Sequence, residues 1–239
     1  MGSKYVLGPE FWQGLRDGLP VMLAVTFFGA LFGATGVSNG LTVWQTVGAS
    51  ASAFAGASQF VFLELYNQQV PVWSVLLAVF AVNFRHVLYS ASVARHIKPF
   101  SKFQKFTGFF FLTDASFAAT EVRITSKQLT TSYYFGYALP FYPIWLISTA
   151  VGAYLGDFIS DPKPLGMDLL LPIYFLVLLM GFKNRPNWLA TVLASGIASV
   201  LIYKTIGAPW HITGGAAVGI LLAAIIGKPS RPIEEKEDV

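Results

Sequence analysis

Cysteine is absent from the 239 residues of this chain, which excludes disulfide bonds and thiolate metal sites. Charged residues are scarce as well: they make up 12% of the chain, against roughly 25% in soluble domains. Hydrophobic residues reach 54%, and the mean hydropathy is +0.58. A chain with so little charge and so much apolar surface is predicted to be an integral membrane protein.

Long polar stretches are missing too, so the chain has no room for a second, soluble domain. We expect a cytoplasmic N-terminal segment over residues 1–18, a single transmembrane transport domain over 19–227 and a disordered cytoplasmic tail over 228–239. The net charge of +4 comes from basic residues in short loops, which report orientation in a membrane. Nucleic-acid binding therefore has no support, and a multi-pass protein of the cell membrane is expected.

Six apolar windows approach the ~20 residues that a helix needs to cross a bilayer. They are Leu19–Val37, Val72–Val93, Phe135–Gly156, Leu165–Phe182, Trp188–Thr205 and Trp210–Gly227. Two further apolar stretches do not fit a simple crossing. Trp44–Tyr66 has polar residues at its centre, and Phe106–Thr120 is too short and carries Asp114 in its middle. The predicted fold class is an all-α polytopic bundle with about six full spans plus two broken or re-entrant helices.

Basic residues in short loops collect on the cytoplasmic side of a membrane, which tests this topology independently. The loops 94–105 and 121–134 are basic. The loops 38–43 and 67–71, by contrast, carry no charge. If one broken element enters from the outer face and the other from the inner face, all basic loops and both termini are cytoplasmic. The alternative, eight full crossings, leaves the most basic loop outside and fits the rule less well.

Glycines four residues apart recur in three of the expected spans. The pairs are Gly29 and Gly33, Gly152 and Gly156, and Gly215 and Gly219. Such small-residue pairs let helix backbones approach closely. The segments 26–33 and 149–156 also share the pattern T-x-x-G-A-x-x-G, which fits either an internal repeat or chance in glycine- and alanine-rich spans.

The sequence FAGASQF, residues 54–60, places polar residues at the centre of the first broken element. A helix broken within the membrane exposes backbone N–H groups at the start of its second half, and these bind a carboxylate. Gly56 permits unusual backbone geometry, while Ser58 and Gln59 supply hydrogen-bonding groups. Together with Ala57 they form the predicted substrate-binding segment. The alternative is that Ser58 and Gln59 only bond a neighbouring helix.

Ionisable residues inside apolar segments are rare and typically face a cavity or a partner. In NFRHVLYS, Asn83 and Arg85 are further candidates for substrate binding, unless Arg85 snorkels to the membrane surface. His86 and Asp114 are the candidates for proton coupling, because an imidazole titrates near neutral pH and a carboxylate can exchange a proton during transport. The alternatives are a structural histidine and a fixed ion pair between Asp114 and Arg85.

Five motifs follow one another along the chain: FAGASQF, NFRHVLYS, the LTD of residues 112–114, LGMDLLLPIYFLVLL and APWHITGG. In sequence and spacing they resemble the AzlC family of branched-chain amino acid exporters, over about residues 14–227. The resemblance implies a large permease subunit that works with a small AzlD-type membrane partner. It also implies export of valine, leucine, isoleucine and in some members methionine, with the proton gradient as driving force. Members often carry an acidic residue after the Asp of LTD, where this chain has Ala115.

A branched-chain amino acid needs an anion site, an acceptor for its ammonium group and an apolar pocket. A half-helix N-terminus near Gly56, or Arg85, suits the carboxylate, and Asp114 or backbone carbonyls suit the ammonium group. The phenylalanines nearest to Asp114 in sequence are Phe109, Phe110, Phe111 and Phe117. They are candidates for the pocket, although aromatic residues in membrane proteins more often serve packing.

Other classes of function stay open at this point. A channel or facilitator for a small neutral or anionic solute would also use half-inserted helices, but would conduct without coupling to pH. An intramembrane enzyme needs a nucleophile with a base, or a metal cluster; the three histidines are dispersed, so no catalytic residue, metal or cofactor is expected. A structural subunit would tolerate loss of Asp114 and Arg85. The expected partners are a small amino-acid substrate, membrane lipids and the small subunit.

Overall fold

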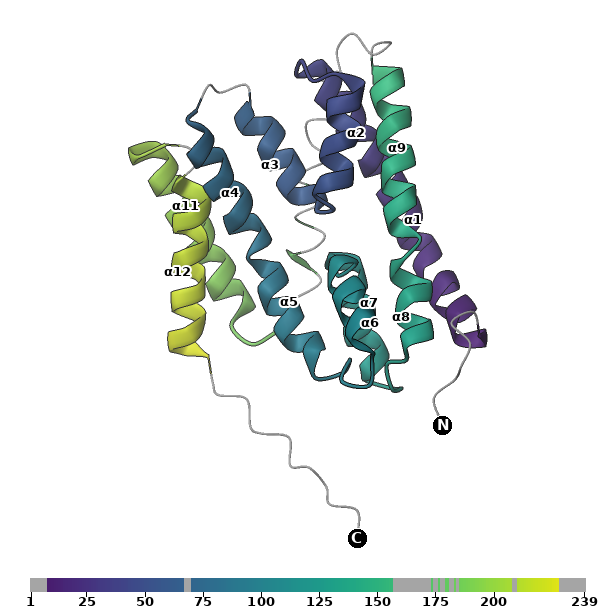
Figure 1. Ribbon diagram of the computed structural model, residues 1–239. Coiled ribbons are helices and arrows are strands. Elements are labelled where there is room, and N and C mark those ends of the chain that lie inside the picture. The colour runs from purple at the N-terminus through teal and green to yellow at the C-terminus, as the bar shows by residue number, and fades with distance from the viewer. Residues whose placement is uncertain are drawn as a thin grey trace. The chain divides into compact units, whose positions relative to one another are not determined.

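The computed structural model describes residues 8–66, 70–156, 185–207 and 210–227, with single positions between 173 and 183. Every regular element within these residues is an α-helix (Figure 1). The chain divides into two compact units, Met1–Leu169 and Leu170–Val239. The expectation of an all-α fold is confirmed for this part of the chain.

In the first unit, α1 (Pro9–Ser38) packs along α9 (Phe141–Gly156) (Figure 1). Glycines make this close approach possible. A Cβ atom on Gly33 would overlap a backbone carbonyl of α9, and one on Gly152 would overlap a carbonyl of α1. The other two glycines of these predicted pairs also meet the opposite helix. The two T-x-x-G-A-x-x-G segments therefore face each other across one helix interface.

Two short helices follow at the end of the unit opposite the N-terminus (Figure 1). The first, α2 (Val43–Ser52), begins at a capping box in which Thr42 and Gln45 exchange side-chain and backbone hydrogen bonds. Residues 53–55 are not helical, and the chain turns back into α3 (Gly56–Tyr66). The apolar stretch that contains FAGASQF is thus two antiparallel half-helices in this structure.

The helices α4 (Val72–Asn83) and α5 (Arg85–Ala94) are interrupted only at Phe84 and run the length of the unit (Figure 1). Together they are long and apolar enough to cross a membrane. Arg85 is the first residue of α5, so its charge lies at the interruption within this span.

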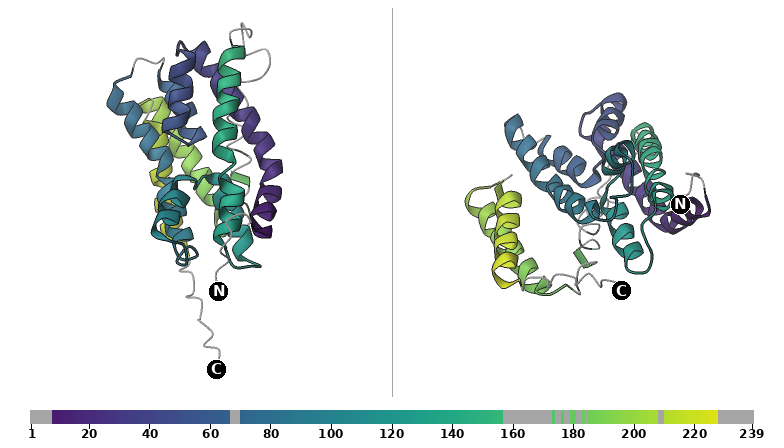
Figure 2. Two further views of the ribbon diagram at one scale, coloured as in Figure 1. Left: turned by 45° about the vertical axis from the view of Figure 1, so that its right-hand side comes forward. Right: turned by 60° about the horizontal axis from the view of Figure 1, so that its bottom comes forward.

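A second pair of short helices occupies the same end of the unit as the N-terminus (Figures 1 and 2). After a capping box at Ser101 comes α6 (Lys102–Phe110), then three non-helical residues, then α7 (Asp114–Ile124). The next helix, α8 (Thr131–Ala138), holds this pair in place: the hydroxyl of Tyr134 donates a hydrogen bond of 2.7 Å to the carbonyl of Gly108.

The second unit contains α11 (Trp188–Thr205) and α12 (Trp210–Ile226), which pack against each other. Gly215 and Gly219 face serines of α11, and Ser195 Oγ donates a hydrogen bond of 2.8 Å to the carbonyl of Gly215. The third predicted glycine pair thus also lies in a helix interface.

Four helical segments of the described residues are long and apolar enough to cross a membrane. They are Pro9–Ser38, Val72–Ala94, Thr131–Gly156 and Trp188–Thr205. The helix Trp210–Ile226 is apolar but shorter. The expected span 165–182 lies almost wholly outside the described residues, as do residues 228–239, so the total of six spans stays a prediction. Because α1 begins at Pro9, part of the expected N-terminal segment is helical.

Candidate substrate site

Arg85 and Asp114, which are 29 residues apart in sequence, form an ion pair in the first unit. Arg85 Nη2 lies 2.9 Å from Asp114 Oδ2, and the two side chains are 20% and 13% exposed. Asp114 is also the first residue of α7, where the helix dipole favours a negative charge. The ion pair considered as an alternative role for Asp114 is therefore present.

Tyr89 completes the surroundings of Asp114. Its hydroxyl donates a hydrogen bond of 2.9 Å to Asp114 Oδ1. Its ring stacks on Phe117, with centroids 4.2 Å apart and planes 9° apart. The sequence prediction did not single out Tyr89, although it lies one helical turn after Arg85 and so on the same face of α5.

Several polar atoms beside this ion pair have unused hydrogen-bonding capacity. Within the described part of the chain, Asn83 Oδ1 and Arg85 Nε are buried and make no hydrogen bond, whereas Arg85 Nη2 is occupied by its ion pair with Asp114. A buried donor or acceptor without a partner lowers the stability of the folded protein by about 1–3 kcal/mol. His86 lies next to them: its Nδ1 is 3.2 Å from the carbonyl oxygen of Asn83. These atoms can bind a polar ligand.

Ser58 and Gln59 hydrogen-bond the backbone at the break between α2 and α3. Ser58 Oγ donates to the carbonyl of Ala55 at 2.9 Å, and Gln59 Nε2 donates to the carbonyls of Ala53 at 2.6 Å and Ala49 at 3.3 Å. Both side chains are buried. Gln59 Oε1 is buried without a hydrogen bond to any described group. The amide NH2 group of Gln59 therefore supports the break, while its carbonyl oxygen is an unused acceptor.

Gly56 does not adopt the unusual backbone geometry expected of it, since its φ is not positive; the absence of a side chain instead leaves room for Trp145 of α9 at the start of α3. A Cβ atom at Gly56 would approach the indole ring to 2.9 Å. Trp145 is 6% exposed, stacks on Phe32 with centroids 6.3 Å apart, and its Nε1–H makes no hydrogen bond within the described residues. Trp145 therefore packs on the N-terminus of α3 and carries a buried N–H donor. Trp145 was not expected at this site, since nothing in its local sequence indicates contact with Gly56.

The two helix breaks meet through aromatic side chains. Phe54, in the first break, stacks on Phe110 at the end of α6 with centroids 6.4 Å apart. Tyr142 of α9 contacts both rings, with centroid distances of 5.2 Å to Phe54 and 5.5 Å to Phe110, and also contacts Phe111. Of the phenylalanines proposed for the apolar pocket, Phe110 and Phe111 thus lie between the breaks, whereas Phe117 lies beside Asp114.

Ala115 packs against an apolar cluster of Met22, Tyr137 and Phe141, which Phe54 also contacts. A second carboxylate at position 115 would lie among apolar side chains, where an unpaired charge is strongly disfavoured.

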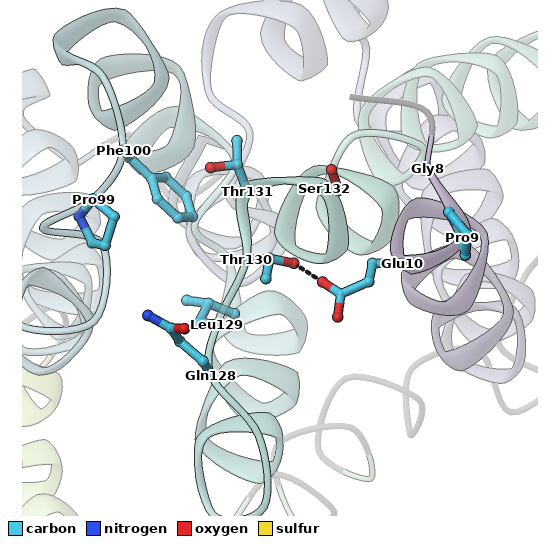
Figure 3. Close-up of a pocket in the computed structure, with 10 residues that line it drawn as sticks. All are labelled: Gly8, Pro9, Glu10, Pro99, Phe100, Gln128, Leu129, Thr130, Thr131 and Ser132. Atoms are coloured by element: carbon cyan, nitrogen blue, oxygen red, sulfur yellow. Dashed lines mark hydrogen bonds between the residues drawn. The ribbon is translucent and has the colours of Figure 1, made fainter. Parts of the chain in front are cut away.

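A further polar network, at the N-terminal end of the unit, was not expected from the sequence. Arg123, only 5% exposed, pairs with Glu10 at 2.9 Å, and its guanidinium lies 4.2 Å from the centroid of the Tyr133 ring. Tyr133 in turn donates to Asp17. Thr130 donates to the other oxygen of Glu10, as Figure 3 shows. Glu10 and Thr130 line a cavity of about 450 Å³. The network ties α1 to the ends of α7 and α8.

Within the described residues, no group of three or more histidines, aspartates or glutamates is placed to hold a metal ion.

The sequence features of this site can be compared with known proteins. Residues 20–159, which include both helix breaks and the ion pair, match the family of the AzlC protein. The chain belongs to the AzlC family. The resemblance seen in the sequence motifs is thereby confirmed. No solved structure matches the chain.

Three curated relatives of this AzlC family member each cover between 81% and 91% of its length. Inner membrane protein YgaZ of Escherichia coli (strain K12) is 28% identical over 223 residues, or 90% of each chain. An uncharacterized membrane protein of Archaeoglobus fulgidus is 28% identical over 217 residues, covering 91% of this chain and 92% of its own. The branched-chain amino acid transport protein AzlC of Bacillus subtilis (strain 168) is 21% identical over 202 residues, covering 81% and 79%. The chain is therefore a membrane protein of a family with a named transport protein.

Proposed function

We propose that this chain is the large subunit of a two-component membrane transporter that exports branched-chain amino acids. Valine, leucine and isoleucine are the proposed substrates, with methionine as a further candidate. One observation carries the proposal: two helix breaks from opposite ends of the unit converge on shared aromatic side chains, with an ion pair at the start of one half-helix. The transport function of the Bacillus subtilis relative supports it, at 21% identity.

In this proposal α2 and α3 dip into the membrane from the outer side, and α6 and α7 from the cytoplasmic side. Basic loops mark the cytoplasmic side, and the loops that flank α6 and α7 contain Arg95, Lys98 and Lys127. The loops that flank α2 and α3 carry no charge. Irregular backbone at membrane depth is tolerated where it lines a cavity. Both termini would then be cytoplasmic.

Each part of a zwitterionic substrate has a suitable group near these breaks. The N-terminus of α3, on which the indole ring of Trp145 packs, offers backbone donors for the substrate carboxylate, and the Nε–H of Arg85 is a further donor without a partner among the described residues. Asp114, or the unpaired Gln59 Oε1, offers an acceptor for the ammonium group. The rings of Phe54 and Phe110 offer an apolar surface for a branched side chain.

Asp114 is the proposed carrier of the coupled proton, and His86 is its neighbour in this role. Protonation of Asp114 would release Arg85 from the ion pair and leave its guanidinium free to bind a substrate carboxylate. Loss of the proton would restore the pair. Substrate binding and proton binding would thus be linked through one guanidinium group.

Transport into or out of vesicles tests this function. The purified chain would be reconstituted into proteoliposomes loaded with radiolabelled valine or isoleucine, with and without an AzlD-type subunit and with and without a proton gradient. Efflux that requires the protein, prefers branched-chain substrates and accelerates with the gradient is expected. Passive flux of small solutes that ignores the gradient would instead identify a channel or facilitator, and no flux with either subunit combination would contradict the transporter proposal.

A further inference from the structure

A groove at the α6–α7 end of the first unit has no role in the proposed transport site. It lies between the loop that joins α5 to α6 and the loop that joins α7 to α8, and its volume is about 610 Å³. Four basic side chains line it: Arg95, His96, Lys98 and Lys127. No aspartate or glutamate lines it. We call this feature the basic groove.

The charges of the basic groove are not neutralised within the described part of the chain. The ion pairs found there are Arg85 with Asp114 and Arg123 with Glu10, and neither involves a residue of the groove. Glu10 is further occupied by Thr130. Cationic side chains that gather around a concave surface without a counter-charge create a strong positive potential and attract anions.

The adjoining cavity of Figure 3 provides a contrast within the same molecule. It shares Pro99, Gln128 and Leu129 with the basic groove, but Glu10 lines it and no lysine or arginine does. The asymmetry in charge is therefore a property of the basic groove itself, and does not extend to every cavity at this end.

The chemistry of the lining favours a phosphate group. Ser126 adds a hydroxyl donor to the cationic side chains, and phosphate oxygens accept hydrogen bonds from both kinds of group, whereas the Thr125 hydroxyl already donates to the carbonyl of Val122. The half-helices that the two loops flank also expose apolar side chains: Phe103 is 75% exposed, Phe106 77% and Val122 71%. A ligand with a phosphate headgroup and acyl chains would match both surfaces.

We propose that the basic groove binds the headgroup of an anionic phospholipid of the cytoplasmic leaflet. The phosphate would bridge the loops before α6 and after α7, and so hold both ends of the half-helix pair that carries Asp114. Basic pockets between membrane helices on the cytoplasmic side are suited to such headgroups, and each basic residue near an anionic surface adds favourable electrostatic energy. The proposal does not depend on which solute the protein transports.

Native mass spectrometry of the purified full chain in neutral detergent tests this proposal. Phosphatidylglycerol is expected to remain bound at concentrations where phosphatidylcholine, which carries no net charge, does not. The triple variant Arg95→Gln, Lys98→Gln, Lys127→Gln is expected to bind phosphatidylglycerol about tenfold more weakly or worse. The control Lys102→Gln, Lys105→Gln, Lys204→Gln changes the net charge by the same amount outside the groove and is expected to bind like the unmodified chain.

Three results would overturn the proposal. One is equal retention of phosphatidylglycerol and phosphatidylcholine by the unmodified chain. Another is equal loss of binding in the triple variant and its control, which would indicate general charge attraction. The third is complete displacement of the lipid by millimolar inorganic phosphate, which would identify a free-phosphate site. Melting temperatures in lipid-free detergent, which should agree among the three proteins, show that the surface substitutions leave the fold intact.

Discussion

Asp114 makes two interactions that a single substitution can distinguish. The ion pair with Arg85 requires the negative charge of Asp114, whereas the hydrogen bond from Tyr89 requires only an acceptor oxygen. Asp114→Asn keeps the acceptor for Tyr89 and removes the charge, so the protein is expected to fold. Proton-driven substrate efflux from proteoliposomes is expected to be abolished, because an amide cannot exchange a proton at physiological pH. Unchanged gradient-driven flux would remove Asp114 from the mechanism.

A double variant distinguishes proton coupling from simple neutralisation of Arg85. If Asp114 only balances the charge of Arg85, then Asp114→Asn combined with Arg85→Gln would recover gradient-driven flux, since neither charge remains. If Asp114 carries the proton, the double variant stays uncoupled. We expect the second outcome, and recovery of coupled flux would assign the pair a structural role.

Gln59 can be tested for a role in substrate binding as opposed to packing. Its Nε2 group donates to the backbone at the break, whereas its Oε1 has no partner among the described residues. Gln59→Ala is expected to weaken binding of radiolabelled isoleucine about three- to tenfold, the equivalent of one lost hydrogen bond. Ser52→Ala is the control, since Ser52 bonds the same carbonyl of Ala49 from an exposed position. A dissociation constant that is unaltered in Gln59→Ala, together with a lower melting temperature, would favour the packing role.

At the scale of helices, the α1–α9 interface depends on the absence of side chains. Gly152→Ala would force a methyl group into the backbone of Ala30, and overpacking of this kind destabilises by about 1–3 kcal/mol. Gly48→Ala is the matched control, because a Cβ atom there meets nothing within 4 Å. Thermal unfolding in detergent should therefore show a lower melting temperature for Gly152→Ala than for the unmodified chain. Gly48→Ala should show no decrease. Equal melting temperatures would contradict the close packing of the two helices.

The helix breaks illustrate what local sequence reveals about an element. Polar residues within 44–66 and 106–120 indicated that neither stretch forms a simple span, and the described helices end at Ser52 and Phe110 within these stretches. Hydropathy and small polar residues are local signals, so they are readable without the fold. The start of α1 at Pro9 was missed, because Glu10, Arg16 and Asp17 lower the hydropathy without opposing helix formation.

At the scale of the whole molecule, orientation in the membrane is the property to test. Because the chain has no cysteine, a single introduced cysteine reports its own position without a background. In intact cells, a membrane-impermeant maleimide is expected to label Ser38→Cys, before α2, and to leave Ser126→Cys, after α7, unlabelled until the cells are permeabilised. Both positions are exposed. Labelling in the reverse order, or of both positions from outside, would contradict the proposed topology.

By itself, the sequence determined the all-α character of the described part of the chain, its place in a membrane, the glycine pairs of its helix interfaces and its family motifs. Each of these depends on composition or on residues a few positions apart. Only the tertiary structure decided that Tyr89 and Arg85 share Asp114, that Trp145 packs on Gly56, and that Phe54 meets Phe110. These contacts join different segments of the chain, mostly far apart in sequence. They form because burial and packing act between segments, which no local pattern encodes.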